Sequence, residues 1–379
     1  MTPQRIPDAE LAAWLRLTLI SGIGGETQRS LLAAFGLPEA IFAAGMTALR
    51  NVVGPLQTER LLRASSEVDT AIATTLAWVN EPGNHILTLA DADYPQALLR
   101  SADPPVLLYL KGRIELLNRP ALAIVGSRNA TPQGLANAEA FAQSFATAGL
   151  GVVSGMALGV DTAAHRGALA AGSAGGATIA VIGTGADRIY PARNRALAQQ
   201  IALEGIIVSE FPLGTPALAG NFPRRNRIIA GLAQGCLVVE AAARSGSLIT
   251  ARLAAEAGRE VFAIPGSIHS PLAKGCHQLI KQGAKLVESA QDVLEELTWS
   301  SHPQTLPPRP TAATPDLFST DDPERASLLA ALGHDPCTLD QLAERSGLTA
   351  ERLLAMLLPL ELEGRVACLP GGIYQRLRA

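Results

Sequence analysis

The chain has 379 residues, a formal net charge of −3 and 48% hydrophobic residues. This length allows two or three domains, the largest with an ample core. Because the net charge is close to zero, any nucleic-acid binding must use a local cluster of cations, and a generally basic surface is excluded. The sequence has no run of about 18 apolar residues, and its first residues do not resemble a secretion signal. We therefore expect a cytoplasmic protein that does not contact a membrane.

Residues 9–73 alternate rows of leucine and alanine with polar breaks, which predicts several short helices joined at glycine turns. The segment LISGIGGETQRSLLAAFG (19–36) resembles a helix-hairpin-helix, in which glycines let backbone N–H groups approach a DNA phosphate. A plain helix-turn-helix in a bundle explains the same pattern, so DNA contact by this segment stays open. We predict a small helical domain of the SAM or helix-hairpin-helix type over residues 1–80.

The next part of the chain begins with an irregular extension at residues 85–118 and then becomes regular. Apolar strand segments alternate with helical segments, a pattern typical of an α/β fold with a parallel sheet, right-handed crossovers and helices on both faces. The strand segments are residues 121–125, 151–154, 178–182, 205–209, 236–240 and 261–264, with a last short strand at 284–287. We predict an extended Rossmann-like domain over residues 81–297.

Residues 298–321 are rich in proline, serine and threonine and have little to bury, which predicts a linker. Residues 322–379 then follow the order helix, helix, helix, hairpin, which is typical of a winged-helix domain. Its third helix, residues 350–362, offers Arg352 against several acids and lacks the cations that DNA reading requires. Since this region has eight acids and six arginines, we favour a protein contact or a lost DNA role.

Ligands of an open parallel sheet bind beyond the carboxyl ends of its strands, so the loops that leave those ends can be identified from the sequence. Five such loops are rich in glycine, hydroxyl and arginine side chains. The first three are Gly126-Ser127-Arg128, the loop that begins with Ser154 and Gly155 and ends at Gly159, and Gly183-Thr184-Gly185. The fourth runs from Glu210 to Arg227 and includes Asn221, Phe222, Arg224, Arg225, Asn226 and Arg227. The fifth is Arg244-Ser245-Gly246-Ser247. Glycines permit close backbone approach, hydroxyls donate hydrogen bonds, and the arginines offer charge for several phosphates at once.

The densest cluster is the three arginines Arg224, Arg225 and Arg227, which we place in the first turn of a helix. A helix start has unpaired N–H groups and a positive dipole end, where cations are disfavoured, so a bound phosphate would explain the cluster. Phe222 beside it is placed to stack on a base, although a core position is the commoner role for such a ring. Internal pairing of the arginines with Glu210 or Glu240 is the structural alternative.

Several other kinds of site are excluded. The four cysteines show no CxxC spacing, and Cys236 falls in an apolar strand pattern, so we expect reduced structural thiols. The spacing of His165, His269 and His277 does not match a metal site, and the segment DTAAHRGAL predicts a helix start capped by Asp161. Neither a GxGxxG nor a GxxxxGK[ST] loop occurs, so no metal and no cofactor are expected.

Six longer runs carry a resemblance to a known family. They are IVGSR (124–128), SGMALGVDTAAHRGAL (154–169), VIGTGADRIYPARNRAL (181–197), SEFPLGTPALAGNFPRRNRIIAGL (209–232), VVEAAARSGSLITARLAAEAGREVFAIPGSI (238–268) and KGCHQLIKQGA (274–284). Through them the sheet domain resembles the DNA-processing protein A (DprA/Smf) family. The resemblance implies a single-stranded DNA-binding protein that protects incoming DNA and helps load the RecA recombinase in natural transformation. It also implies a homodimer through the sheet domain, with Arg128 and the loop from Phe222 to Arg227 in the DNA pocket.

The alternative function is enzymatic. Related sheet domains of the lysine-decarboxylase-like group cleave nucleotide N-glycosidic bonds and carry a PGGxGTxxE turn after the equivalent strand. The corresponding turn here is AARSGSLIT, so Ile249 and Thr250 stand where carboxylates are needed. Without a general acid or nucleophile no catalytic residue is expected. A winged-helix regulator with a ligand-sensing sheet domain is a third possibility, against which the acidic third helix argues.

Overall fold

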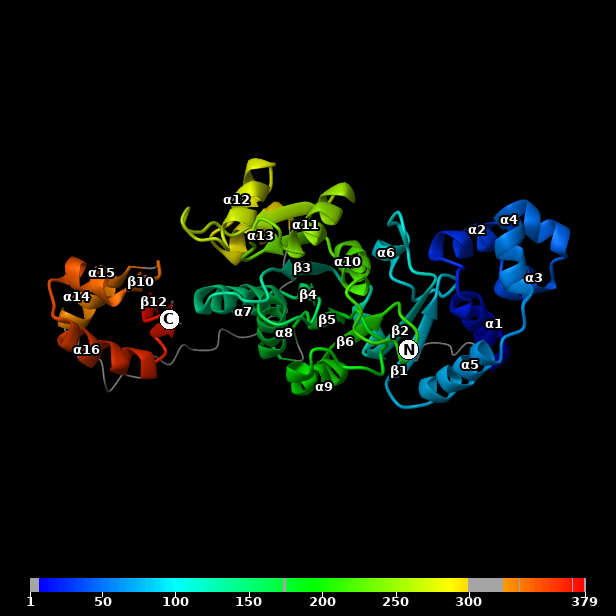
Figure 1. Ribbon diagram of the computed structural model, residues 1–379, viewed down its shortest axis with the longest axis horizontal. Coiled ribbons are helices and arrows are strands. Elements are labelled where there is room, and N and C mark those ends of the chain that lie inside the picture. Colours follow the sequence, from blue (N-terminus) through cyan, green and yellow to red (C-terminus); the bar gives the residue numbers. More distant parts are fainter. Residues whose placement is uncertain (1–6, 173–174, 299–322, 334, 370, 378–379) are drawn as a thin grey trace.

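The computed structural model describes residues 7–172, 175–298, 323–333, 335–369 and 371–377. Its N-terminal part, blue in Figure 1, is helical. The helices there are α1 (Asp8–Leu19), α2 (Gly25–Phe35), α3 (Pro38–Ala43), α4 (Met46–Leu62) and α5 (Ser66–Val79). Gly36 ends α2, and Gly54, with a φ of 80°, interrupts α4 next to Pro55. Both breaks fall at turns that the sequence predicts, because glycine adopts positive φ without a steric cost.

The centre of the described chain is a sheet of nine strands in the order β1-β2-β6-β5-β4-β3-β7-β8-β9. The strands are β1 (Asn84–Thr88), β2 (Leu107–Gly112), β3 (Ala121–Val125), β4 (Gly151–Ser154), β5 (Thr178–Val181), β6 (Ile206–Ser209), β7 (Gly235–Val238), β8 (Glu260–Ala263) and β9 (Lys285–Leu286). From β6 to β9 all neighbours are parallel, whereas β2 pairs antiparallel with both β1 and β6. The predicted Rossmann-like parallel sheet is confirmed, and the extension at residues 85–118 contributes two of its strands.

Helices cover both faces of this sheet. One face carries α7 (Pro132–Thr147), α8 (Val160–Ala170), α9 (Arg195–Glu204) and α13 (Ala290–Glu296), and the other α6 (Gln96–Leu99), α10 (Asn221–Leu232), α11 (Ser247–Glu256) and α12 (Lys274–Lys281). Short 3₁₀ turns lie at η1 (Ile114–Leu116) and η2 (Ala192–Asn194). Side chains of β3 alternate between the faces: Leu122 packs with Phe145 of α7, and Ala123 lies in the same cluster as Ile228 of α10. This period of two is what a strand buried on both faces produces.

The sheet has one point where its connections diverge. Strand β3 lies between β4 and β7, and it leads to α7 on one face, while β7 leads to α11 on the other. Adjacent loops that leave in opposite directions open a crevice at the carboxyl ends of their strands. The fold therefore places its crevice between the loop after β3 and the loop after β7.

The helical part shares a core with the edge of the sheet. Trp14 of α1 and Trp78 of α5 are buried in one cluster with Ile86 of β1 and Tyr109 of β2. The rings of Trp78 and Tyr109 lie 6.1 Å apart at an angle of 60°. This common core fixes the helical part against β1 and β2, because burying such rings contributes more than any single surface contact.

The C-terminal part, orange to red in Figure 1, has the predicted winged-helix order. It consists of α14 (Pro323–Leu332), β10 (Cys337–Thr338), α15 (Leu339–Ser346), α16 (Ala350–Leu362), β11 (Val366–Leu369) and β12 (Ile373–Arg376). Thr338 forms a capping box with Gln341, and Thr349 caps α16, as expected from their positions. The predicted linker lies outside the described residues except for Thr298.

The start of helix α8 differs from the sequence-based prediction. Asp161 was predicted as its N-cap, but the helix begins at Val160 with Gly159 as the N-cap, and Asp161 is buried in the first turn. Gly159 has a φ of 80°, and a Cβ there would lie 2.2 Å from the carbonyl oxygen of Ser127. The close approach of the loop after β3 thus selects glycine at the cap position, and Asp161 turns inward, where its carboxylate accepts a hydrogen bond from the N–H of Ala157 at 3.3 Å.

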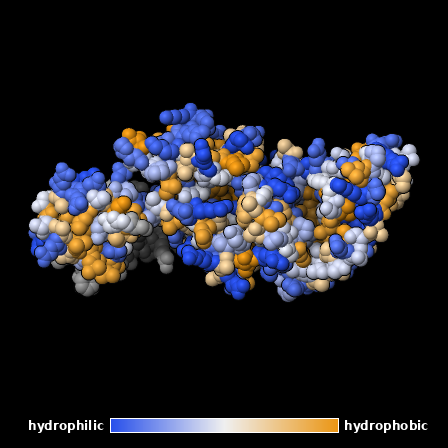
Figure 2. Space-filling view, viewed as in Figure 1, coloured by the Kyte–Doolittle hydropathy of each residue, from blue (hydrophilic) through white to orange (hydrophobic). Residues whose placement is uncertain are grey.

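In the part of the chain that the structure describes, no helix combines the length and the apolar character that a bilayer crossing requires. Figure 2 shows hydrophilic residues spread over all parts of the visible face, with smaller hydrophobic areas between them.

The buried His165 gives the fold a pH dependence. Its Nδ1 lies 2.7 Å from the hydroxyl of Thr178, which itself donates to the carbonyl of Val152, so Nδ1 carries the proton. Nε2 is buried and has no hydrogen-bond partner among the described residues. Protonation of Nε2 would bury an unpaired charge, and burial, together with the nearby Arg225, lowers the pKa of His165 to about 3.

We expect the free energy of unfolding to fall as the pH drops below 6.5, the ordinary histidine pKa, because the unfolded chain then binds one proton more than the folded chain. The loss is at most about 1.4 kcal/mol per pH unit. His165→Gln removes this contribution, so the stability gap between wild type and variant should shrink between about pH 7 and about pH 5. Urea titrations at several pH values measure it, and a gap that stays constant with pH would contradict the assignment.

Candidate functional site

A cleft of about 720 Å³ lies at the carboxyl ends of β3 and β7, and we call it the switch-point cleft. Its walls are the loop after β3, the loop after β7 and the start of α10. Ten of the predicted site residues line it: Gly126, Ser127, Arg128, Phe222, Arg225, Asn226, Arg244, Ser245, Gly246 and Ser247. The structure thus brings together loops that are more than 100 residues apart in the sequence, as the strand-end argument predicts.

Glu240 holds the loop after β3 in place. It lies just beyond β7, and its carboxylate accepts hydrogen bonds from the N–H of Thr131 at 2.9 Å and from the Thr131 hydroxyl at 2.6 Å. Gly134 leaves room for this carboxylate, since a Cβ there would lie 2.4 Å from it. Burial raises the pKa of Glu240, and the two hydrogen bonds from Thr131 oppose this shift. Glu240 therefore ties the loop that carries Arg128 to β7. Among the described residues its carboxylate is hydrogen-bonded to Thr131 and forms no ion pair with an arginine.

Two aromatic rings and an arginine form one wall of the cleft. The guanidinium of Arg128 lies over the ring of Phe222 at 5.7 Å from its centre, and the ring of Tyr190 lies 5.7 Å from that of Phe222. Phe222 is half-buried, whereas Tyr190 is 49% exposed. Sequence reasoning missed Tyr190, although it follows Gly183-Thr184-Gly185 in the loop that leaves β5. An exposed ring beside a held ring and a cation is a surface for flat, anionic ligands.

Arg225 forms the floor of the cleft and is only 5% exposed. Its Nη1 donates to the carbonyls of Gly155 and Val181, and its Nε donates to Asn226 at 3.0 Å. The guanidinium lies against Gly155, where a Cβ would stand 2.2 Å from both Nη atoms. Burial raises the pKa of Asp161 and lowers that of Arg225, and each group opposes the shift of the other. Arg225 is thus a fixed buried charge at the base of the cleft.

Three predicted site residues lie beneath the cleft and do not line it. Ser154 is fully buried and its hydroxyl donates to the carbonyl of Ile124 at 2.7 Å. Asn221 donates to the carbonyl of Gly183 at 3.1 Å. Gly155 supports the Arg225 guanidinium, as described above. These residues shape the backbone of the cleft.

The predicted arginine cluster is divided by the helix that carries it. Helix α10 begins at Asn221 and not at the arginines, so Phe222 and Arg224 lie in its first turn, whereas Arg225 and Arg227 lie in the second, contrary to the prediction. The three arginines therefore point in different directions around the axis. Arg225 points inward, whereas Arg224 and Arg227 line a separate cleft on the other side of Pro223. There Arg227 pairs with Glu210 and, at 3.0 Å, with Asp103. The alternative of internal pairing therefore applies to Arg227.

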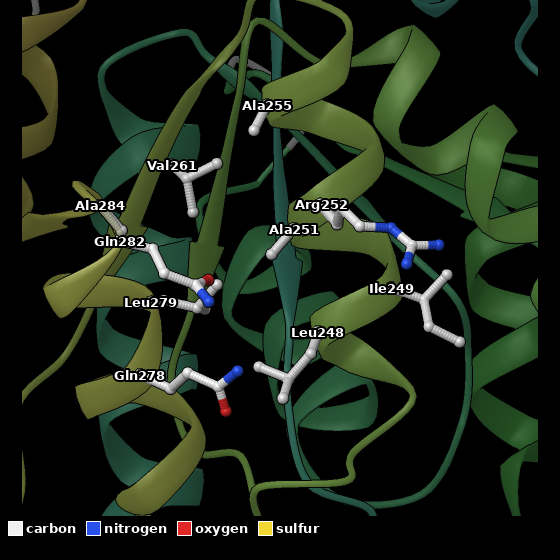
Figure 3. Close-up of a pocket in the computed structure, with 10 residues that line it drawn as sticks. All are labelled: Leu248, Ile249, Ala251, Arg252, Ala255, Val261, Gln278, Leu279, Gln282 and Ala284. Atoms are coloured by element: carbon white, nitrogen blue, oxygen red, sulfur yellow. The ribbon is translucent and has the colours of Figure 1, made fainter.

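A third hollow, of about 330 Å³, lies between α11 and α12 and contains none of the predicted site residues. Figure 3 shows Leu248 and Leu279 facing each other across it, while Ile249 and Arg252 project from the other flank of α11. Its lining is apolar apart from Arg252 and the glutamines Gln278 and Gln282. It offers little to an anionic ligand.

Comparison with known proteins identifies the family of this chain. Residues 85–298 match the family model described as DNA recombination-mediator protein A, and residues 307–372 match that of the DprA winged helix domain. The chain belongs to the DNA recombination-mediator protein A family. The family match includes every wall of the switch-point cleft, and the family assignment predicted from the sequence is confirmed, as is the winged helix.

Members of the DNA recombination-mediator protein A family match over long stretches. Protein Smf of Escherichia coli is 40% identical over 370 residues, 96% of this chain and 95% of that protein. The DNA processing protein DprA of Streptococcus pneumoniae is 51% identical over 209 residues, 55% of this chain and 73% of that protein. Its X-ray structure superposes with a TM-score of 0.65 at 38% identity, covering 77% of this chain and 99% of that one. A structure of the Helicobacter pylori protein, described as showing a single-stranded DNA binding mode, gives a TM-score of 0.51 at 32% identity, covering 56% and 96%.

The contact of Arg225 with Gly155 leads to a prediction about stability. We expect Gly155→Ala to lower the free energy of unfolding by about 1 to 3 kcal/mol, because the new methyl group displaces the buried guanidinium. The same change at Gly246 should stay within about 0.5 kcal/mol, since nothing lies within 4 Å of a Cβ there. Denaturant titrations measure both.

The control is a double-mutant cycle with Arg225→Ala. Removal of the guanidinium vacates the space that the methyl group would take. Gly155→Ala should therefore lower the free energy of unfolding by less in the Arg225→Ala background than in wild type. Equal costs in both backgrounds would show that Gly155 is required for a reason other than the arginine.

Proposed function

We propose that this protein binds single-stranded DNA without sequence preference in the switch-point cleft. The observation that carries the proposal is the presence, in one open cleft, of three arginines (Arg128, Arg225 and Arg244) beside the rings of Phe222 and Tyr190. Fixed cations neutralise phosphates, and exposed rings stack on bases of any identity. A duplex keeps its bases stacked inside, so this combination favours a single strand.

The cations and polar groups of the cleft suit a phosphate backbone. Arg128 and Arg244 are exposed. Ser245, Gly246 and Ser247 lie at the start of the ten-residue helix α11, so the positive end of its helix dipole lies at the cleft. Gly246 keeps the backbone accessible, since nothing lies within 4 Å of a Cβ there. Ser127, Asn226 and Ser247 offer hydrogen-bonding groups. We assign direct phosphate contact to the exposed arginines and to the start of α11. The buried Arg225 contributes a positive electrostatic potential at the floor of the cleft.

We further propose that the protein has no catalytic activity. Asp161 lines the cleft, but its carboxylate accepts a hydrogen bond from the Ala157 N–H, and the nearby charge of Arg225 opposes the rise of its pKa. Ile249 and Thr250 also line it, at the positions where glycosidic cleavage would need acids. The carboxylate of Asp161 is thus buried and bound to the backbone, and we assign it no catalytic role.

The name of the family, a recombination mediator, supports a wider role. We propose that the protein protects incoming single strands in the cytoplasm and helps load the RecA recombinase on them in natural transformation, as a homodimer through its sheet domain. The family match over residues 85–298, which includes the whole parallel sheet, is the support for this role.

Two variants separate phosphate contact from base stacking. Arg128→Ala should weaken binding to every single-stranded sequence and make the dependence of log K on log salt shallower by about 0.7, because one counterion contact is lost. Phe222→Ala should cost about 1 to 3 kcal/mol of binding and leave the salt slope unchanged. Fluorescence anisotropy at several salt concentrations measures both.

Arg195→Ala, an exposed arginine on α9 outside the cleft, is the matched control and should change neither quantity. A thermal melt of each variant checks folding. If Arg128→Ala and Phe222→Ala both fold and bind like wild type, the cleft is not the DNA site.

A further inference from the structure

A second cleft, of about 950 Å³, lies between the helical part and the sheet domain, and we call it the junction cleft. One side comes from residues 23–29 of the glycine turn and α2, and the other from Asp103, Glu210 and the start of α10. Pro223 and Ile249 line both the junction cleft and the switch-point cleft. The two clefts therefore adjoin on either side of the first turn of α10.

Ion pairs hold the two sides of the junction cleft together. Arg29 of α2 pairs with Asp103 at 2.6 Å, Asp103 also pairs with Arg227 at 3.0 Å, and Arg227 pairs with Glu210. Arg29 in addition donates to the carbonyl of Pro104 at 3.0 Å. Glu210 is buried, which raises its pKa, while Arg227 and Arg224 oppose that shift. Arg29 and Arg227 thus have carboxylate partners, and their ion pairs link α2 to α10.

Two other arginines in the junction cleft have a different environment. Arg224 is exposed, and its guanidinium lies over the ring of Phe211 at 5.3 Å, which fixes its direction. The Arg252 side chain is 68% exposed, and its ion pair with Glu256 at 3.4 Å links residues one helical turn apart. Such exposed pairs contribute only a few tenths of a kcal/mol, so they yield to a phosphate at small cost. Arg224 and Arg252 are therefore available as phosphate contacts.

The rings near these arginines are not available to bases. Phe211 is 4% exposed and Tyr109 2% exposed, so both belong to the floor of the cleft. This differs from the switch-point cleft, where Tyr190 is 49% exposed. A strand in the junction cleft would be held by its phosphates, with its bases free of stacking on the protein.

We propose that the junction cleft is a second contact for the backbone of the same single strand, made by Arg224 and Arg252 and bounded by the glycine turn of the helical part. The proposal rests on the proposed function of the switch-point cleft, because a strand that leaves it past Pro223 enters the junction cleft directly. It gives the helical domain a function, namely to form the far wall of the path that the strand follows. Of the three arginines that follow Phe222, only Arg225 lines the switch-point cleft, and Arg224 and Arg227 line the junction cleft. The proposal gives Arg224 a function there.

The experiment compares strand lengths on the full chain. Oligothymidylates of about 6 and about 20 nucleotides are chosen because single-strand sites of one module span about 4 to 16 nucleotides. Arg224→Ala should weaken binding of the long strand several-fold, lower its salt slope by about 0.7 and leave the short strand unaffected. Arg252→Ala should act in the same way, whereas Arg128→Ala should weaken both lengths and Arg195→Ala neither.

The outcomes distinguish the two claims. If wild type binds neither length, or if Arg128→Ala and Phe222→Ala both bind like wild type, the proposed function itself fails. If wild type binds both and Arg128→Ala weakens both, but Arg224→Ala and Arg252→Ala leave the long strand unaffected, the junction cleft is not part of the path. Equal weakening of the short and the long strand by Arg224→Ala would also overturn the proposal, since it would place this arginine in the first cleft.

Discussion

The burial of one charged group, the guanidinium of Arg225, determines the arrangement of the site. A buried charge is costly unless hydrogen bonds and an opposite charge surround it. Here the carbonyls of Gly155 and Val181, the side chain of Asn226 and the nearby Asp161 provide this environment. The carboxyl ends of β4 and β5 must therefore meet the N-terminal part of α10, and residue 155 must lack a side chain.

The fixed position of Arg225 also directs its neighbours. Because Arg225 anchors the N-terminal part of α10, Phe222 comes to lie under Arg128 on one side and Arg224 over Phe211 on the other. The loop with Arg128 is held from the opposite direction by Glu240, which accepts two hydrogen bonds from Thr131. The loops after β3 and β7 and the start of α10 thus position the same wall of rings and cations. Such preorganisation lowers the entropy lost when a flexible strand binds.

The sequence was sufficient to predict much of this protein, and the exceptions have physical reasons. Alternating apolar strands and helices predicted the parallel sheet, and the residues after each strand predicted which loops meet at its edge. The direction of each arginine could not be predicted, because moving the start of α10 back to Asn221 rotates the whole set around the axis. Gly159 as a cap was missed because the need for it comes from the carbonyl of Ser127, more than 30 residues earlier. Tyr190 was missed since its partner ring, Phe222, is also more than 30 residues away in the sequence.

In the proposed complex a single strand lies across the switch-point cleft with its bases on the rings of Tyr190 and Phe222. Ultraviolet crosslinking of the full chain to an oligothymidylate, followed by peptide mapping, tests it most directly, because a base stacked on an aromatic ring is held in contact with it. We expect crosslinked peptides that contain Tyr190 and Phe222, with loss of the first in Tyr190→Ala. Crosslinks confined to the winged-helix residues 350–377, with the cleft peptides unmodified, would contradict it.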